Sequence, residues 1–135
     1  MQFKSIFILL LLLSLSQIGR SQMTSESIAS EVVELGGLVE SAKGQLVVLL
    51  KRQPQNIGKS DNELEQILLK SISLEAYRVN LVELFASRFS STELLQLKTF
   101  LLDHDYSSYK QMTQSIHSDL YTIGYDLGQR TLNGS

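Results

Sequence analysis

The stretch FSSTELLQLKTF, residues 89–100, decides the fold class, because it has the pattern of a capped amphipathic helix. Ser90 stands at the N-cap and Glu93 three residues later, the spacing of a capping box in which each side chain satisfies a backbone amide of the first turn. Phe89 and Leu94 flank the box at the positions of a hydrophobic staple. The stretch therefore predicts a helix that begins after Ser90, and capping accounts for its polar residues without a catalytic role.

Apolar residues recur at helical spacing before this stretch as well. Alternating steps of four and three, the period of one helix face, connect Ile28, Val32, Leu35, Val39, Ala42, Leu46 and Leu49. Gly36 and Gly37 interrupt this pattern, and each glycine costs roughly 1 kcal/mol inside a helix relative to alanine. Two helices over 25–35 and 38–52, or one continuous helix, are both compatible with the sequence.

A polar segment, residues 53–62, contains the only proline and is the one predicted loop. Ser60 and Glu63 then form a second capping-box pattern, which predicts the start of the next helix. The apolar stripe that follows either continues or breaks near Ser71 or Ser73 before it resumes at Leu74. Since no stretch alternates like a strand, we expect one all-α domain over 22–135, a bundle of about five helices.

The first 21 residues have the pattern of a secretory signal peptide. Lys4 precedes an unbroken apolar run, residues 6–13, and small residues follow it. A helix over residues 5–16 reaches only about 18 Å, short of a hydrocarbon core of roughly 30 Å, so cleavage is favoured over a membrane anchor. Cleavage after Ser21 fits best, and cleavage after Ser16 is the alternative.

Charge and cysteine content narrow the setting of the mature chain. Removal of Lys4 and Arg20 leaves 10 of the 12 basic residues against 14 acidic ones, a net charge of −4. This balance argues against nucleic acid as a partner. The chain has no cysteine, whereas small secreted animal domains commonly depend on disulfides, which favours a bacterial periplasmic or secreted protein.

The capped stretch also resembles a known signature. Residues 89–100 are similar to the motif F-T-x-x-E-L-x-x-L-x-x-F-Y-x-S-P-x-G of a domain-of-unknown-function family of small exported helical bacterial proteins. Ser90 replaces the family threonine, Leu101 its tyrosine, and residues 103–106 its Ser-Pro-x-Gly turn. Residues 32–37 and 123–129 resemble other family segments more loosely. The resemblance implies a secreted or periplasmic helical bundle and implies no activity.

The most metal-like cluster is Asp103-His104-Asp105, since carboxylates and imidazole bind divalent cations. The only other histidine, His117, lies thirteen positions beyond His104, so a third converging ligand is missing. We therefore expect a loop in which Asp105 caps the next helix. No catalytic constellation is visible, and we predict neither an enzyme, nor a metal site, nor a cofactor.

The last helix offers a better candidate surface. On a helical wheel, a narrow core stripe centred on Ile116 contains Tyr109, Met112, Ile116, Leu120, Ile123 and Leu127. Tyr121 and Tyr125 lie about 140° and 180° from that centre, with Gly124 and Gly128 beside them. These four residues predict a contact surface for a partner or a second copy. The competing interpretations are that another helix covers this flank or that both tyrosines are simply solvated.

The sequence thus predicts an exported helical protein that acts by binding, or as a structural part of the envelope, through an unknown protein partner or self-association. No stable membrane span is expected. The alternative is a carrier of an apolar ligand or lipid, because amphipathic helices rich in leucine, valine and isoleucine could enclose a cavity. A tightly packed core explains the same residues.

Overall fold

The computed structural model describes residues 25–134. Within this range the chain is helical with short connections and forms no strand, so the predicted all-α bundle is confirmed. No helix between residues 25 and 134 is long and apolar enough to cross a bilayer. The proposed signal peptide and both of its cleavage points lie outside the described residues.

The glycine pair divides the first helical stretch in two. Residues 25–35 are helical, and α2 (Leu38–Lys51) follows after a turn. Gly37 has φ 64°, a left-handed conformation that side chains with a Cβ rarely adopt. A Cβ on Gly36 would lie 3.1 Å from the backbone oxygen of Val32. The break that the sequence left open is therefore present, and the left-handed conformation of Gly37 is the part of it that favours glycine.

The predicted polar loop contains a short 3₁₀ turn, η1 (Pro54–Asn56). Asn56 is buried there and donates its side-chain amide to the backbone oxygen of Leu50 at 2.9 Å, which fastens the loop to the end of α2. Helix α3 (Asp61–Ser71) then begins at Ser60, whose hydroxyl accepts from the amide of Glu63 at 3.2 Å. The predicted helix start is confirmed, although only the serine half of the capping box is present.

The second possible break is also present, because Ile72 and Ser73 are both extended. Helix α4 (Leu74–Arg88) starts after Ser73, whose hydroxyl accepts from the amide of Ala76 at 3.1 Å. The serine that interrupted the apolar stripe is thus an N-cap.

The capping box of residues 89–100 is complete. The Ser90 hydroxyl accepts from the amide of Glu93 at 3.2 Å, and the Glu93 carboxylate accepts from the amide of Ser90 at 2.9 Å. Phe89 and Leu94 are both buried in the same apolar cluster, as a staple requires. Helix α5 (Ser91–Leu102) begins where the sequence predicted.

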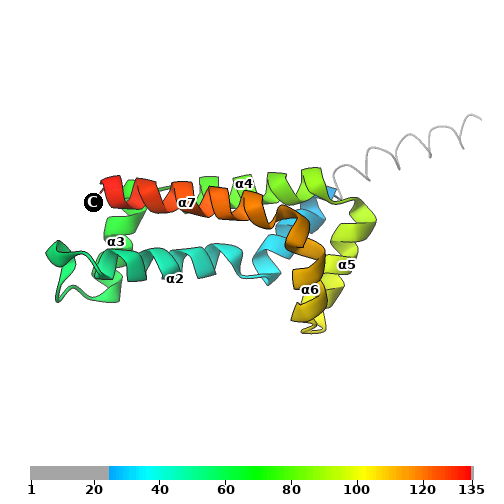
Figure 1. Ribbon diagram of the computed structural model, residues 1–135, viewed down its shortest axis with the longest axis horizontal. Helices are drawn as coiled ribbons and strands as arrows, with labels where there is room; N and C mark the ends of the chain where they lie inside the picture. Colours follow the sequence, from blue (N-terminus) through cyan, green and yellow to red (C-terminus); the bar gives the residue numbers. More distant parts are fainter. Residues whose placement is uncertain (1–24, 135) are drawn as a thin grey trace, which may run out of the picture.

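The prediction of one straight helix from Tyr109 to Leu127 was wrong. Helix α6 (Tyr106–Thr113), the 3₁₀ turn η2 (Gln114–Ile116) and α7 (His117–Gly134) are separate, and α6 runs across the direction of α7 (Figure 1). At the end of α6 the Thr113 hydroxyl donates to the backbone oxygen of Tyr109 at 2.9 Å. One helical wheel therefore describes the faces of α7 but does not extend across the turn to α6.

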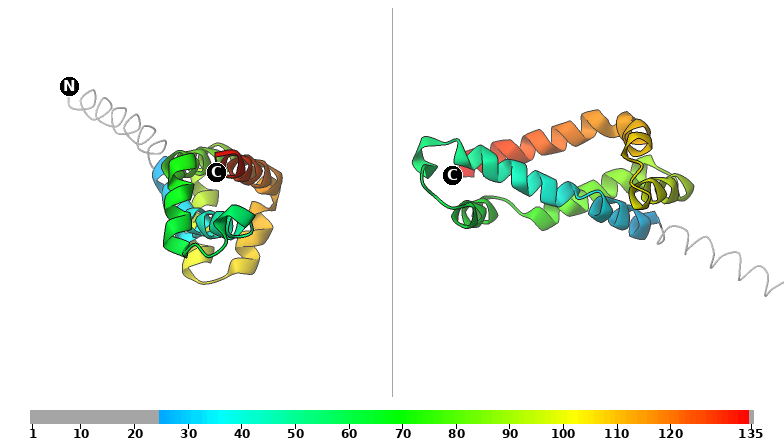
Figure 2. Two further views of the ribbon diagram at one scale, coloured as in Figure 1. Left: turned by 90° about the vertical axis from the view of Figure 1, so that its left-hand side faces the viewer. Right: turned by 90° about the horizontal axis from the view of Figure 1, so that it is seen from below.

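Two apolar clusters lie at opposite ends of an elongated molecule (Figures 1 and 2). One is built from residues 25–35, α4, α5 and η2, with Phe85, Leu94 and Ile116 fully buried. The other joins α2, α3 and the end of α7 around Leu50 and Leu64. Tyr77 of α4 packs against both clusters. In the stretch between the clusters, α2 and α7 run side by side in the same direction (Figures 1 and 2).

Candidate functional site

The outer side of α7 carries two exposed aromatic rings. Tyr121 and Tyr125 are 69% and 56% exposed, and their rings stack with centroids 6.3 Å apart and planes 22° apart. A Cβ on Gly124, which lies between them, would meet nothing within 4 Å. No neighbouring helix within residues 25–134 covers these rings. One stacked pair of this size on a small domain is a pronounced apolar feature.

A groove of about 430 Å³ runs between this side of α7 and helix α2. We call it the α2–α7 groove. One wall consists of Leu120, Tyr121, Gly124, Tyr125, Leu127 and Gly128. The other consists of Ala42, Gln45, Leu46 and Leu49, with Tyr77 of α4 also lining the groove. All four residues that the sequence predicted as a contact surface therefore line one groove.

The lining of this groove is uncharged. It contains no carboxylate, imidazole, ammonium or guanidinium group among the residues that form it. The one hydroxyl away from the rim belongs to Tyr77, and burial raises the pKa of its phenol, which stays neutral at physiological pH. An uncharged, mostly apolar surface suits association and offers no acid–base pair for chemistry.

The α2 wall and Tyr77 were not predicted as parts of the site. Their apolar members follow helical stripes that were assigned to the core, and a stripe does not show which of its residues stay at the surface.

The Asp103-His104-Asp105 cluster is a helix junction. His104 has φ 58°, and its amide and that of Asp105 donate back to Leu101 and Phe100 at 3.2 and 2.8 Å. This is the Schellman pattern that ends many helices, with histidine at the position where glycine is usual.

Asp105 also caps α6, as the sequence predicted. Its carboxylate accepts from the hydroxyl and the amide of Ser108 at 2.7 and 3.2 Å, and these bonds lower the pKa of Asp105. The ring of His104 bonds instead to the hydroxyl of Tyr106, with Nδ1 and oxygen 2.8 Å apart. No group of three or more potential metal ligands occurs between residues 25 and 134, and His117 is not brought to this junction.

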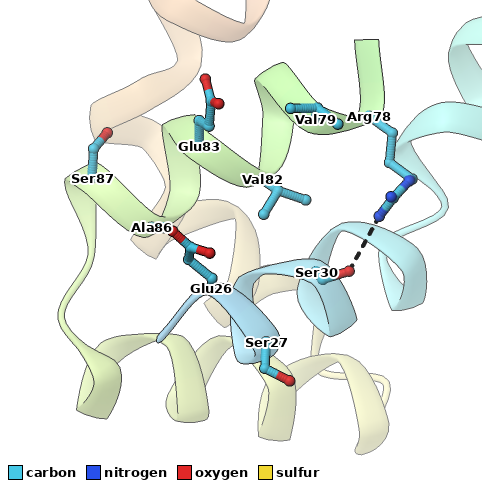
Figure 3. Close-up of a pocket in the computed structure, with 9 residues that line it drawn as sticks. All are labelled: Glu26, Ser27, Ser30, Arg78, Val79, Val82, Glu83, Ala86 and Ser87. Carbon is cyan, nitrogen blue, oxygen red and sulfur yellow. Dashed lines mark hydrogen bonds between the residues drawn. The ribbon is translucent and has the colours of Figure 1, made fainter. Parts of the chain in front are cut away.

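A second groove, of about 860 Å³, lies between residues 25–35 and α4 (Figure 3). Its apolar lining comes from Val79, Val82 and Ala86, and Glu26 and Glu83 add carboxylates. The sequence did not predict it, because its two walls are about fifty residues apart in the chain.

The one cation of this second groove is already engaged. Arg78 pairs with Glu75 at 2.6 Å and donates to the hydroxyl of Ser30 at 3.3 Å. The guanidinium thus ties the two walls together and is not free to bind a ligand anion. We therefore take the uncharged α2–α7 groove as the candidate site.

Comparisons with known proteins add no relative. No family model, no curated protein and no solved structure matches this chain. The resemblance to the domain-of-unknown-function family therefore remains a prediction.

Proposed function

We propose that this protein is an exported, non-catalytic binding module that contacts a protein partner through the α2–α7 groove. The observation that supports this proposal is the pair of stacked, exposed tyrosines beside an uncharged groove. Tyrosine supplies a large contact area and a hydroxyl at the rim, and it is enriched among the residues that dominate binding energy at protein interfaces. Export rests on the pattern of residues 1–21.

A carrier of an apolar ligand is the second candidate, and the size of the groove favours it. About 430 Å³ falls within the usual range for small-molecule sites, roughly 300–1,000 Å³. Such sites bury about 70–90% of their ligand. Tyr121 and Tyr125 are themselves more than half exposed, so a small molecule beside them would stay largely in water. A protein surface laid over the groove would remove both rings from water.

Native mass spectrometry of protein purified from the exported fraction tests the proposal. Wild-type protein should lack residues 1–21 and should retain a second protein chain. The double variant Tyr121→Ser/Tyr125→Ser should lose that chain, while each substitution changes the free energy of unfolding by only about 0.5 kcal/mol, as at other surface positions.

Tyr106→Ser is the matched control, because Tyr106 is 55% exposed but lies on α6. It should retain the partner. A double variant that keeps its partner, or wild-type protein that carries no second chain, would refute the proposal. A small molecule retained by wild-type protein alone would favour the carrier. A collapsed thermal melt of the double variant would show that the tyrosines hold the fold together.

A further inference from the structure

Four residues of different chemical character follow one another at regular intervals along the outward side of α2. Glu40, Gly44, Val48 and Arg52 follow at four-residue steps and line one shallow notch of about 470 Å³. A Cβ on Gly44 would meet nothing within 4 Å, while Val48 is 48% exposed. The Glu40 side chain is 76% exposed and forms an ion pair on its own helix with Lys43 at 3.3 Å, while Arg52 forms no ion pair with any residue between 25 and 134. An acid, a gap, an apolar side chain and a base thus follow in order.

This order is complementary to its own reverse. If a second α2 lies antiparallel on the first, centred between Gly44 and Val48, each Val48 meets the gap at Gly44 of the other copy. Each Glu40 then meets Arg52 of the other copy, which gives two pairs of opposite charges. Such a surface pairs with itself, as a two-fold symmetric interface requires.

The exposed side of α7 is complementary to its reverse in the same way. The order Tyr121, Gly124, Tyr125, Gly128 has its centre between Gly124 and Tyr125. In an antiparallel pair of α7 helices about that centre, Tyr121 lies over Gly128 of the other copy and Tyr125 over Gly124. Each ring meets a position without a side chain, which allows two helices to approach closely.

The two centres lie at the same height along the molecule. Helices α2 and α7 run in the same direction (Figures 1 and 2), and a Cβ on Gly128 would lie 4.0 Å from Cδ2 of Leu49. Gly128 lies three to four residues beyond the α7 centre, and Leu49 lies three residues beyond the α2 centre. The two centres therefore lie at one height, as a single two-fold axis across both helices requires. Gln45 lines both the notch and the α2–α7 groove, so the two adjoin at this residue.

We infer that the partner on the α2–α7 groove is a second copy of this chain, packed antiparallel about this axis. The inference rests on the proposed function and specifies its partner. The four tyrosine rings would form the apolar centre of the interface, and the Glu40–Arg52 pairs would lie at the two ends of α2, where they select the antiparallel orientation.

A charge exchange tests the orientation. Glu40→Arg and Arg52→Glu each place like charges opposite one another at both ends, so each should weaken the dimer about tenfold in sedimentation equilibrium. The double variant Glu40→Arg/Arg52→Glu restores opposite charges and should return the dissociation constant to within about twofold of wild type. Glu83→Arg makes the same charge change on α4 and should leave dimerisation unchanged.

A single cysteine tests the position of the axis, since the natural chain has none. Gln45 lies one residue from the α2 centre, so the antiparallel pairing brings it close to Gln45 of the other copy. A disulfide requires Cα atoms about 4.4–6.8 Å apart. Oxidised Gln45→Cys protein should therefore form a covalent dimer. Glu83→Cys, away from this face, should stay monomeric under the same oxidant.

The outcomes separate this inference from the proposed function. A wild-type protein that sediments as a monomer at every concentration would refute the inference that the partner is a second copy. It would not refute a different protein partner, which the double tyrosine variant tests separately. A dimer that is lost in Tyr121→Ser/Tyr125→Ser but is indifferent to the charge variants would overturn the antiparallel axis. Rescue in the double charge variant, with covalent trapping at position 45, would establish it.

Discussion

Replacement of Ser90 by alanine tests the most explicit local prediction, the capping box that starts α5. The substitution removes the hydroxyl that accepts from the amide of Glu93 at 3.2 Å. It leaves the bond from the amide of Ser90 to the Glu93 carboxylate, 2.9 Å long, because that bond uses only backbone at residue 90. One helix-end amide of α5 therefore loses its partner.

The expected loss is about 1 kcal/mol of unfolding free energy. Loss of an N-cap hydroxyl costs about 0.5–2 kcal/mol in proteins. The remaining bond from Glu93 and the full burial of Leu94 and Leu97 keep the helix in place, so the effect should not spread beyond its first turn. For a domain of this size, 1 kcal/mol corresponds to a decrease of about 4 °C in Tm.

Urea denaturation followed by circular dichroism measures this loss, with two matched variants. Ser90→Asp keeps an acceptor at the N-cap and should stay within about 0.5 kcal/mol of wild type. Ser87→Ala removes an exposed hydroxyl three residues earlier, inside α4, where it only donates to the backbone oxygen of Leu84 at 3.0 Å. This control should be neutral or slightly stabilising, because alanine is the better helix former.

An unchanged denaturation midpoint in Ser90→Ala would show that α5 begins elsewhere. Equal losses in Ser90→Ala and Ser87→Ala would show that the effect is not capping. A loss far above 2 kcal/mol would mean that the first turn of α5 supports the apolar cluster beneath it more strongly than its cap bond implies.

Three further predictions follow from backbone conformation and titration. In denaturant melts, Gly37→Ala should destabilise the monomer by about 1 kcal/mol, because φ at this position is 64°. Gly44→Ala should stabilise the monomer by a similar amount, because Gly44 is helical and has open space at its Cβ. Stability changes of the same sign in the two variants would contradict this. Burial raises the pKa of Tyr109 to about 12. The stability that the neutral phenol contributes is therefore fully present below the unfolded pKa of about 10 and is lost as pH rises to about 12. In melts at several pH values, Tyr109→Phe should remove this part of the alkaline loss. Hydrogen bonds from Ser108 lower the pKa of Asp105. The stability that this carboxylate contributes is therefore present above the unfolded pKa of about 3.9 and is lost on further acidification. Asp105→Asn should make stability depend less on pH in this acid range, and an unaltered pH dependence would argue against the cap.

Helix starts were the most predictable part of the fold. The N-caps Ser60, Ser90 and Asp105 were all identified in advance, because capping depends on residues within one turn of chain and needs no tertiary information. The breaks at Gly37 and Ser73 were recognised as possible but not decided. A glycine or serine permits either continuation or a turn, and the packing of the flanking helices selects between them.

The turn between α6 and α7 was missed because its sequence contains neither glycine nor proline. Residues 109–127 keep an unbroken helical period, and a period alone does not show that its two halves face different neighbours. In the structure Tyr109 packs against the cluster of α4 and α5, whereas Leu127 packs against that of α2 and α3. Leu120, which follows η2, still packs against the first cluster, so α7 passes from one core to the other along its length.

The candidate site was half predictable. Tyr121, Gly124, Tyr125 and Gly128 belong to one helix, so their common face follows from 100° per residue. Their neighbours Gln45 and Tyr77 are distant in the chain, and only packing brings them to the same groove.

The sequence by itself determined the helical class, the starts of α3, α5 and α6 and the aromatic face of α7, because each depends on residues within about two turns of one another. Tertiary structure alone decided that α2 lies beside α7 in the same direction, that Tyr77 joins two separate clusters, and that the centres of the patterns on α2 and α7 lie at the same height. These relations depend on which apolar stripe buries against which other. Since many stripes of leucine, valine and isoleucine are interchangeable in sequence, only the packed structure selects among them.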